Sequence, residues 1–181
     1  MFLARHSISA LPDKKRIRKL LKAKPNFLQC GPGEVLCLVD SGSTVNAAWI
    51  ARHFPAFTSK VQPTPASERG DTATTACGKQ LRNKGRVVIP AKVAGKAFPV
   101  AFKDMEVEMP ILSVRKMVKR RNVVRFADGG GTIRNSQTGR TIRFYEHEGV
   151  YFLKLKVDDV TDMVIDDDPM EVEPGFTRPG M

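Results

Sequence analysis

The sequence predicts an all-β fold, in which short strands close into a barrel or pack as a sandwich. Two observations favour this class. Apolar or alternating segments of about four to eight residues recur along the chain and are separated by Gly, Asn, Asp and Ser turn signals. In addition, glycine-containing turns join the segments 123–126, 132–135, 141–145 and 150–157, which is typical of antiparallel hairpins. The chain of 181 residues is long enough to bury one compact core.

The N-terminal region is strongly basic and predicts a short helix at residues 14–24. Its basic residues, with no acid among them, are Lys14, Lys15, Arg16, Arg18, Lys19, Lys22 and Lys24. Ile17, Leu20 and Leu21 recur at helical spacing, which gives the helix one apolar edge. The turn Gly31-Pro32-Gly33 follows, so residues 1–30 are predicted to form a basic arm. Counterion release at such a run predicts a weak nucleic-acid contact, although nothing in it reads bases.

Residues 34–39 predict a strand that is buried on both faces, because the run is almost continuously apolar. The strand runs directly into Asp40-Ser41-Gly42, a composition that is typical of turns. On its own, this tripeptide is explained by an Asx-turn that closes a strand. Its context supports a second interpretation, because buried strand walls make a carboxylate harder to ionise and a glycine lets backbone amides approach it. Asp40 is therefore a candidate catalytic residue.

The middle of the chain predicts a series of short elements. A short helix is expected at 47–53, followed by an exposed loop rich in Pro and Ser at 63–71. The Thr and Val content of 72–80 and 85–93 predicts two strands of one hairpin. Beyond this hairpin, 97–102 and 107–111 are expected to be strands, and 113–121 a short helix with solvated basic residues.

The C-terminal part divides into a β-rich segment and an acidic tail. Residues 150–157 alternate well, with Tyr151, Leu153, Leu155 and Val157 on one face. After them the acids are Asp158, Asp159, Asp162, Asp166, Asp167, Asp168, Glu171 and Glu173. This composition predicts that residues 158–181 form a disordered acidic tail and that the folded domain spans residues 31–157.

Three segments resemble known retroelement proteins. The run Val35-Leu36-Cys37-Leu38-Val39-Asp40-Ser41-Gly42 resembles the signature of the retropepsin family, a hydrophobic stretch followed by Asp-Thr/Ser-Gly. Pro110-Ile111-Leu112-Ser113-Val114 is similar to the family's later apolar-apolar-Gly segment, with Ser113 in place of Gly. The segments 123–126, 138–140 and 149–153 look like the region between protease and integrase in copia-like retrotransposon polyproteins. The resemblance implies a retropepsin-like closed barrel with one short helix and extra C-terminal β-hairpins.

The resemblance also implies an aspartic endopeptidase that hydrolyses a peptide or polyprotein substrate. Asp40 would be catalytic, and Ser41, Gly42 and Ser43 would support it. Aspartic proteases use two carboxylates that share a proton, and this chain has one Asp-Ser-Gly. The nearest second candidate, Asp128-Gly129-Gly130, is better explained as a plain hairpin turn. A homodimer is therefore expected, in which a two-fold axis brings two Asp40 side chains together.

Two further expectations follow from the same resemblance. The hairpin at 72–93 would be a flap that closes over bound peptide, with its tip either at Cys77, Gly78, Lys79 and Gln80 or at the turn Asn83-Lys84-Gly85. The hydroxyl of Ser43 would donate a hydrogen bond to the Asp40 carboxylate. Because a donor to the charged form favours ionisation, we expect this bond to lower the pKa of Asp40.

The amino-acid composition bears on cofactors, metals and cellular location. The chain has three cysteines, an odd number without a CxxC pair, and three histidines that form no ligand pattern. We therefore expect no cofactor, no metal and a reducing, cytoplasmic location. No apolar run approaches the roughly 20 residues that span a membrane, so no membrane association is expected. Two alternative functions stay open: a catalytically inactive retropepsin-like dimerisation or binding module, and a basic nucleic-acid-binding fragment of a retroelement.

Overall fold

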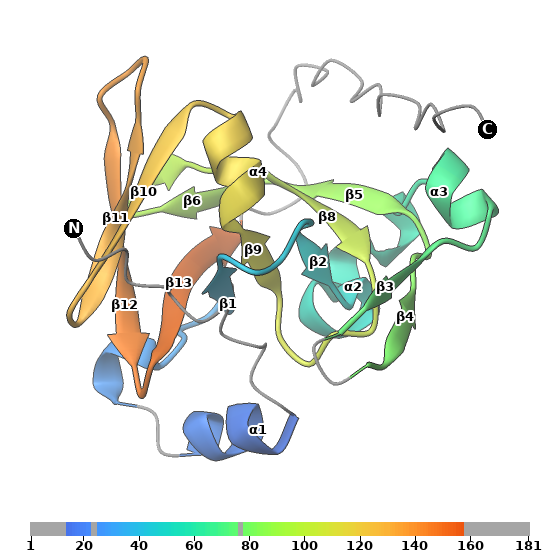
Figure 1. Ribbon diagram of the computed structural model, residues 1–181, viewed down its shortest axis with the longest axis horizontal. Coiled ribbons are helices and arrows are strands. Elements are labelled where there is room, and N and C mark those ends of the chain that lie inside the picture. Colours follow the sequence, from blue (N-terminus) through green and yellow to red (C-terminus); the bar gives the residue numbers. More distant parts are fainter. Residues whose placement is uncertain (1–13, 23–24, 76–77, 158–181) are drawn as a thin grey trace, which may run out of the picture.

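The computed structural model describes residues 14–22, 25–75 and 78–157. This part of the chain is mostly β, with a sheet that curls into a half-barrel and short helices around it (Figure 1). The predicted acidic tail, residues 158–181, lies outside the described residues. None of the helices in the described ranges is long and apolar enough to cross a membrane.

The regular elements are short. The helical segments are α1 (Lys14–Lys22), η1 (Asn26–Leu28), α2 (Ile50–His53), η2 (Pro55–Lys60), α3 (Pro65–Glu68) and α4 (Val114–Lys119). The strands are β1 (Glu34–Asp40), β2 (Ala47–Ala48), β3 (Thr72–Thr74), β4 (Gln80–Arg82), β5 (Arg86–Ile89), β6 (Ala91–Val93), β7 (Lys96–Ala97), β8 (Val100–Asp104), β9 (Ile111–Ser113), β10 (Asn122–Ala127), β11 (Gly130–Asn135), β12 (Thr141–His147) and β13 (Val150–Val157). The resemblance implied one short helix in the barrel, whereas the described residues between 31 and 157 contain α2, α3 and α4, so this part of the expectation is wrong.

The strands of the main sheet follow the order β10-β11-β12-β13-β1-β9-β2-β8-β5, and β6 adds to β13 and β7. β10 and β5 stand at opposite ends of this path and do not pair with each other. The sheet is consequently a curled half-barrel instead of the expected closed barrel. The C-terminal hairpins were predicted correctly, because β10–β11 and β12–β13 are antiparallel pairs joined by glycine-containing turns.

The hairpin expected at 72–93 is wrong in its pairing. β3 pairs with β4 in a separate two-stranded sheet, whereas β5 pairs with β8. The reason lies at Gly85, where an added Cβ would come within 2.8 Å of the Val61 side chain and closer still to the Gln62 carbonyl. Gln62 and Arg86 exchange two backbone hydrogen bonds of 2.8 Å, so the chain turns away from β4 and enters the main sheet.

The structure also differs from the prediction in one helix and in one loop. The helix expected at 47–53 begins only at Ile50, because Ala47 and Ala48 pair with neighbouring strands as β2. The segment expected to be an exposed loop contains α3, which begins with a capping box between Thr64 and Ser67. Each side chain of this box bonds the backbone of the other residue, which satisfies two amides at the start of the helix.

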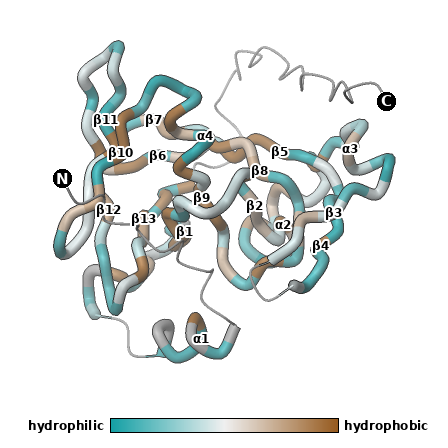
Figure 2. Tube along the Cα trace, viewed as in Figure 1, coloured by the Kyte–Doolittle hydropathy of each residue, from teal (hydrophilic) through white to brown (hydrophobic). Residues whose placement is uncertain are grey.

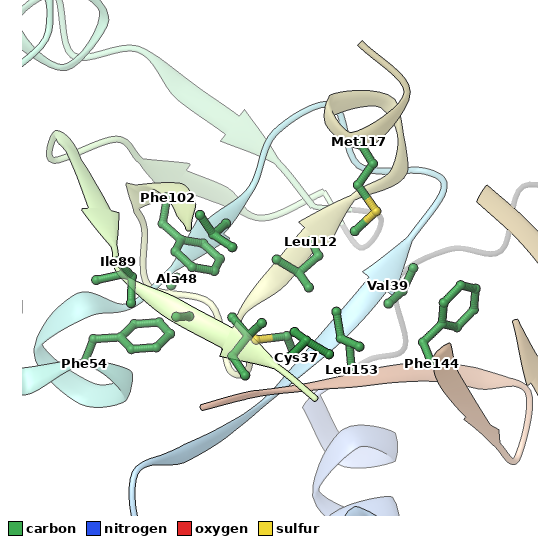
Figure 3. Packing of buried hydrophobic residues seen from close by; sticks show 14 of the residues in the cluster. Cys37, Val39, Ala48, Phe54, Ile89, Phe102, Leu112, Met117, Phe144 and Leu153 are labelled. Atoms are coloured by element: carbon green, nitrogen blue, oxygen red, sulfur yellow. The ribbon is translucent and has the colours of Figure 1, made fainter. Parts of the chain in front are cut away.

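β1 separates two apolar clusters. Cys37 and Val39 face the main core, where they meet residues from several strands, α2 and α4, among them Leu112, Met117, Phe144 and Leu153 (Figure 3). The opposite face of β1 belongs to a second cluster, called here the Asp40-side cluster: Ile17, Leu28, Leu36, Leu38, Ala47, Leu81, Met105, Val107, Met109, Ile111, Val150 and Phe152. Figure 2 shows the corresponding hydrophobic residues along the central strands and hydrophilic residues around α3.

Candidate active site

Parallel pairing of β1 with β9 places the two predicted motifs side by side. The register joins Leu38 to Ile111, Val39 to Leu112 and Asp40 to Ser113. Both strands are apolar until these last residues, and both end at the same edge. Ser113 then begins α4 as its N-cap, accepting a hydrogen bond from the Lys116 amide at 3.3 Å. A carboxyl group and a buried hydroxyl, distant in the sequence, therefore lie at the ends of two neighbouring strands.

Ser113 fixes the loop that follows Asp40. Its side chain is fully buried, and its hydroxyl donates to the Ser43 carbonyl oxygen at 2.6 Å. Its backbone amide donates to the side-chain oxygen of Asn46 at 2.8 Å, and Asn46 in turn donates to the Ala101 carbonyl oxygen at 3.1 Å. A glycine at position 113 would leave the Ser43 carbonyl without this donor. Ser113, which departs from the resembling motif, thus has a specific structural role here.

Asp40 has one satisfied and one unsatisfied carboxyl oxygen. The Gly42 amide donates to Oδ1 at 2.8 Å. The second oxygen, Oδ2, is buried, and no hydrogen-bond donor among the described residues reaches it. Burial raises the pKa of Asp40 above its ordinary value, while the backbone amides of Gly42 and Ser43 act in the opposite direction. The site therefore favours a protonated carboxyl group more than water does.

The expected role of the Ser43 hydroxyl is wrong. This hydroxyl donates to the Val45 carbonyl oxygen at 2.7 Å and closes a tight turn within the loop. Ser43 bonds to Asp40 through its backbone amide, so the pKa of Asp40 does not depend on the Ser43 hydroxyl as a donor. A donor from Ser43 does lower the pKa of Asp40, as expected, but it is the backbone amide, and desolvation outweighs it so that the net direction is upward. Ser41 and Gly42 are exposed at the turn, and a contact of Ser41 with a second subunit stays a prediction.

The candidate flap is the β3–β4 hairpin. Its turn closes through the Gly78 amide on the Thr75 carbonyl oxygen and the Thr75 amide on the Lys79 carbonyl oxygen, both at 2.9 Å. This turn coincides with the first of the two expected tips, and Gly78 and Lys79 are exposed there; its role as a flap stays a prediction. Cys77, also predicted there, lies outside the described residues. Gln80 is the first residue of β4, and its side chain accepts from the Thr72 hydroxyl at 2.6 Å.

The Asp40-side cluster connects this hairpin to the carboxyl group. Leu36, Leu38 and Asp40 alternate along β1 and therefore share one face of the strand. Leu81 of β4 and Ile111 of β9 are buried in the same cluster as Leu38. The base of the hairpin consequently packs on the apolar surface that leads to Asp40.

The basic helix α1 docks on this same surface. Ile17 is only 7% exposed and belongs to the Asp40-side cluster. Next to it, the Arg18 guanidinium pairs with the Glu108 carboxylate at 3.1 Å, and Arg52 of α2 reaches the same carboxylate at 3.4 Å. Sequence reasoning found the helix and its apolar edge but missed the surface it contacts, because no local signal identifies a partner that is distant along the chain.

His53 holds the segment that carries Glu108. Its Nδ1 accepts from the Trp49 amide at 3.2 Å, and its Nε2 lies 3.1 Å from the Glu108 carbonyl oxygen. Burial lowers the pKa of His53, so the neutral ring is favoured, with Nε2–H donating to that carbonyl. The histidine therefore fixes the position of the residues opposite Ile17 and does not supply a proton at the Asp40 site.

No protein-family model, no curated protein and no solved structure matches the chain. The chemistry of the site thus rests on its geometry, which offers a carboxyl group with a raised pKa, a loop fixed by Ser113 and Asn46, and an adjoining apolar surface. These features suit general acid–base chemistry on an uncharged group, because such chemistry needs a carboxyl group that holds its proton near the working pH.

The raised pKa of Asp40 predicts that Asp40→Asn stabilises the fold at neutral pH. A carboxyl group with a raised folded-state pKa contributes stability below its unfolded pKa of about 3.9, and loses that contribution as pH rises through the folded-state value. Asparagine does not titrate and keeps an acceptor for the Gly42 amide. The urea midpoint of the variant should exceed that of the wild type at pH 7, with a smaller difference under acidic conditions. Asp128→Asn, on an exposed turn, is the control, and a lower midpoint for Asp40→Asn at neutral pH would contradict the assignment.

Proposed function

We propose that this chain is one half of an aspartic endopeptidase of retroviral or retrotransposon type, which hydrolyses peptide bonds as a homodimer. The observation that carries the proposal is the buried Asp40 Oδ2, which no donor in the described part of the chain reaches. A buried carboxyl oxygen without a partner costs about 1–3 kcal/mol. A second carboxyl group or a reacting water would satisfy this oxygen.

The second carboxyl group would come from a second copy of the chain. The sequence contains one Asp-Ser-Gly, and the other turn of similar composition, at Asp128, lies between β10 and β11 and is exposed. A two-fold axis beside Asp40 would place two identical carboxyl groups together. Since two carboxylates cannot both ionise at close range, they would share one proton, and the pKa raised by burial favours this shared state.

The pair would act on a water molecule and a scissile amide. The ionised carboxylate accepts a proton from the water as its oxygen attacks the carbonyl carbon, and the protonated carboxyl group donates to the carbonyl oxygen. The tetrahedral intermediate then collapses: the carboxyl group that took the water proton donates it to the amine nitrogen as the C–N bond breaks, and the other carboxylate recovers a proton from a hydroxyl of the intermediate. In this scheme the Gly42 and Ser43 amides keep the Asp40 carboxyl group oriented, and Ser113 keeps their loop in place.

The surroundings of Asp40 favour an extended peptide with apolar side chains. Leu38 and Ile111, on β1 and β9 beside the site, are buried and would support it from below, and the β3–β4 hairpin would pair its backbone with that of the peptide. If the chain forms part of a polyprotein, the junctions of that polyprotein would be its first substrates. A catalytically inactive dimeric module is the alternative, and it differs in one respect: it would form the dimer without cleaving peptides.

Replacement of Asp40 is the direct test of catalysis. Asp40→Asn should reduce kcat/KM on a mixed peptide pool by at least about 10²–10⁴-fold, the range for loss of a general acid–base group. Inhibition by a statine-type compound should apply to the wild type only, since its hydroxyl replaces the lytic water. Asp128→Asn is the matched control and should cleave normally. Equal activity of the wild type and Asp40→Asn would disprove the proposal, and a wild-type dimer without activity would favour the inactive module.

Activity should also depend on subunit concentration. Because each chain supplies half of the carboxyl pair, specific activity per subunit should fall as dilution separates the dimer. Peptide cleavage and sedimentation velocity, measured over the same concentration series, should give the same midpoint. A verified monomer that cleaves at undiminished specific activity would show that one chain is sufficient.

The docked α1 should compete with substrate, because Ile17 is buried in the cluster that adjoins Asp40. Ile17→Ala weakens this packing and should lower KM several-fold with little change in kcat. Lys19→Ala, at an exposed position of the same helix, is the control. The melting temperature of each variant separates the possible outcomes: a lower melting temperature with an unchanged KM would mean that α1 only stabilises the fold.

A further inference from the structure

The strands β10, β11 and β12 present three arginines on one face. In the antiparallel register, Arg125 lies opposite Thr132, which lies opposite Arg143. Likewise, Arg134 lies between Val123 and Thr141. Residues directly opposite each other on paired strands point to the same side of a sheet. The face formed by Val123, Arg125, Thr132, Arg134, Thr141, Arg143 and Tyr145 is called here the arginine face.

The arginine face points outward. The alternating residues Ile133, Ile142 and Phe144 are buried in the main core, so the other face of these strands is the inner one. Arg125, Arg134 and Arg143 are all exposed. In Figure 1 the strands that carry them stand at the left edge of the molecule, whereas β1 and β9, which carry the Asp40 site, lie at its centre.

The charge of this face is of one sign. It contains no carboxylate, and within the described residues none of its arginines forms an ion pair. Among the acids near these strands, Asp128 and Glu148 lie in the turns at one end, and Glu146 of β12 alternates with Tyr145 and therefore belongs to the opposite side of the sheet. Solvated faces usually mix both signs of charge. Arginine also differs from lysine, because its planar guanidinium matches the geometry of a phosphate group and can bind it through two parallel hydrogen bonds.

One aromatic side chain completes the surface. Tyr145 is 44% exposed and lies opposite Gly130, which in turn lies opposite Ala127. On its other side Tyr145 lies opposite Phe152 of β13, which is buried. An exposed aromatic ring next to arginines is the combination that single-stranded nucleic acids use, with bases stacked on the ring and phosphates on the cations.

We propose that the arginine face binds single-stranded nucleic acid without strong sequence preference. The three guanidinium groups contact phosphates, and Tyr145 stacks against a base. The site is separate from Asp40, so the proposal does not depend on peptidase activity. The net charge of +11 favours association with such a polyanion over long range. The chain's own acidic residues 158–181 are the competing occupant.

Fluorescence anisotropy tests this proposal. It measures binding of a labelled single-stranded RNA of mixed sequence to the full chain over a series of salt concentrations. Each phosphate contact on a single strand contributes about 0.7 to the slope of log K against log salt concentration. The combined variant Arg125→Gln, Arg134→Gln, Arg143→Gln should therefore reduce the slope by about 2. The control Lys15→Gln, Lys19→Gln, Lys22→Gln removes the same charge from exposed positions of α1 and should keep most of the slope.

Tyr145 supplies a test that charge alone would not pass. Tyr145→Leu should weaken binding about ten-fold, whereas Tyr145→Phe should bind like the wild type, because stacking needs the ring. Melting temperatures show whether each variant is folded. An equal reduction of the salt slope in the two triple variants would mean that binding depends on total charge only and would contradict the proposal. A duplex that binds as tightly as the single strand would exclude stacking on Tyr145. If the full chain shows no salt-dependent binding of RNA, the proposal is overturned. If binding then appears once residues 158–181 are removed, the acidic residues of the chain itself occupy the arginine face.

Discussion

The burial of β1 on both faces is the constraint on which the rest of the structure depends. Each buried aliphatic side chain of this strand contributes about 1.5–3 kcal/mol, and β1 carries them toward two separate clusters. One or two such side chains offset the cost of leaving Asp40 Oδ2 without a partner, which is about 1–3 kcal/mol. The strand can therefore hold a poorly solvated carboxyl group at its end without losing the fold. A surface strand with fewer buried side chains would contribute too little stability to offset this cost.

Local patterns predicted those features whose causes are local. β1, the four C-terminal strands, α4 and the turn after Asp40 follow from apolar periodicity and turn residues close in the sequence. The errors have distant causes. The partner of β5 depends on the close approach of Gly85 to Gln62. The loop that contains Ser43 is held by Ser113 of a distant element, while the Ser43 hydroxyl bonds the Val45 carbonyl oxygen within the loop. The sequence around Gly85 and Ser43 does not indicate these contacts, because their partners lie far away along the chain.

Ser113 departs from the motif that the sequence resembles, and the structure gives its hydroxyl two partners. In the resembling family a glycine occupies this position, and the sequence alone gave a reason to doubt the site. Within the fold the hydroxyl has two roles, because it donates to the Ser43 carbonyl oxygen and accepts from the Lys116 amide at the start of α4. The same atom thus couples the loop after Asp40 to the helix after β9. A site that tolerates only small side chains can therefore accept serine when a buried carbonyl needs a donor.

The sheet order has a consequence for the two proposed functions. β13 pairs with β1 along one edge and with β12 along the other, so only one strand separates the strand of Asp40 from the arginine-bearing hairpins. The register places the two surfaces on the same side of the sheet, because Tyr145 of β12 lies opposite Phe152 of β13, and Phe152 lies opposite Leu38 of β1. The other side of these strands carries Phe144, Leu153 and Val39, which belong to the main core. The hydrogen-bonded sheet therefore sets the distance between the arginines and the strand that carries Asp40. If the arginine face binds nucleic acid as proposed, a protein bound to the same nucleic acid would be held close to the Asp40 site.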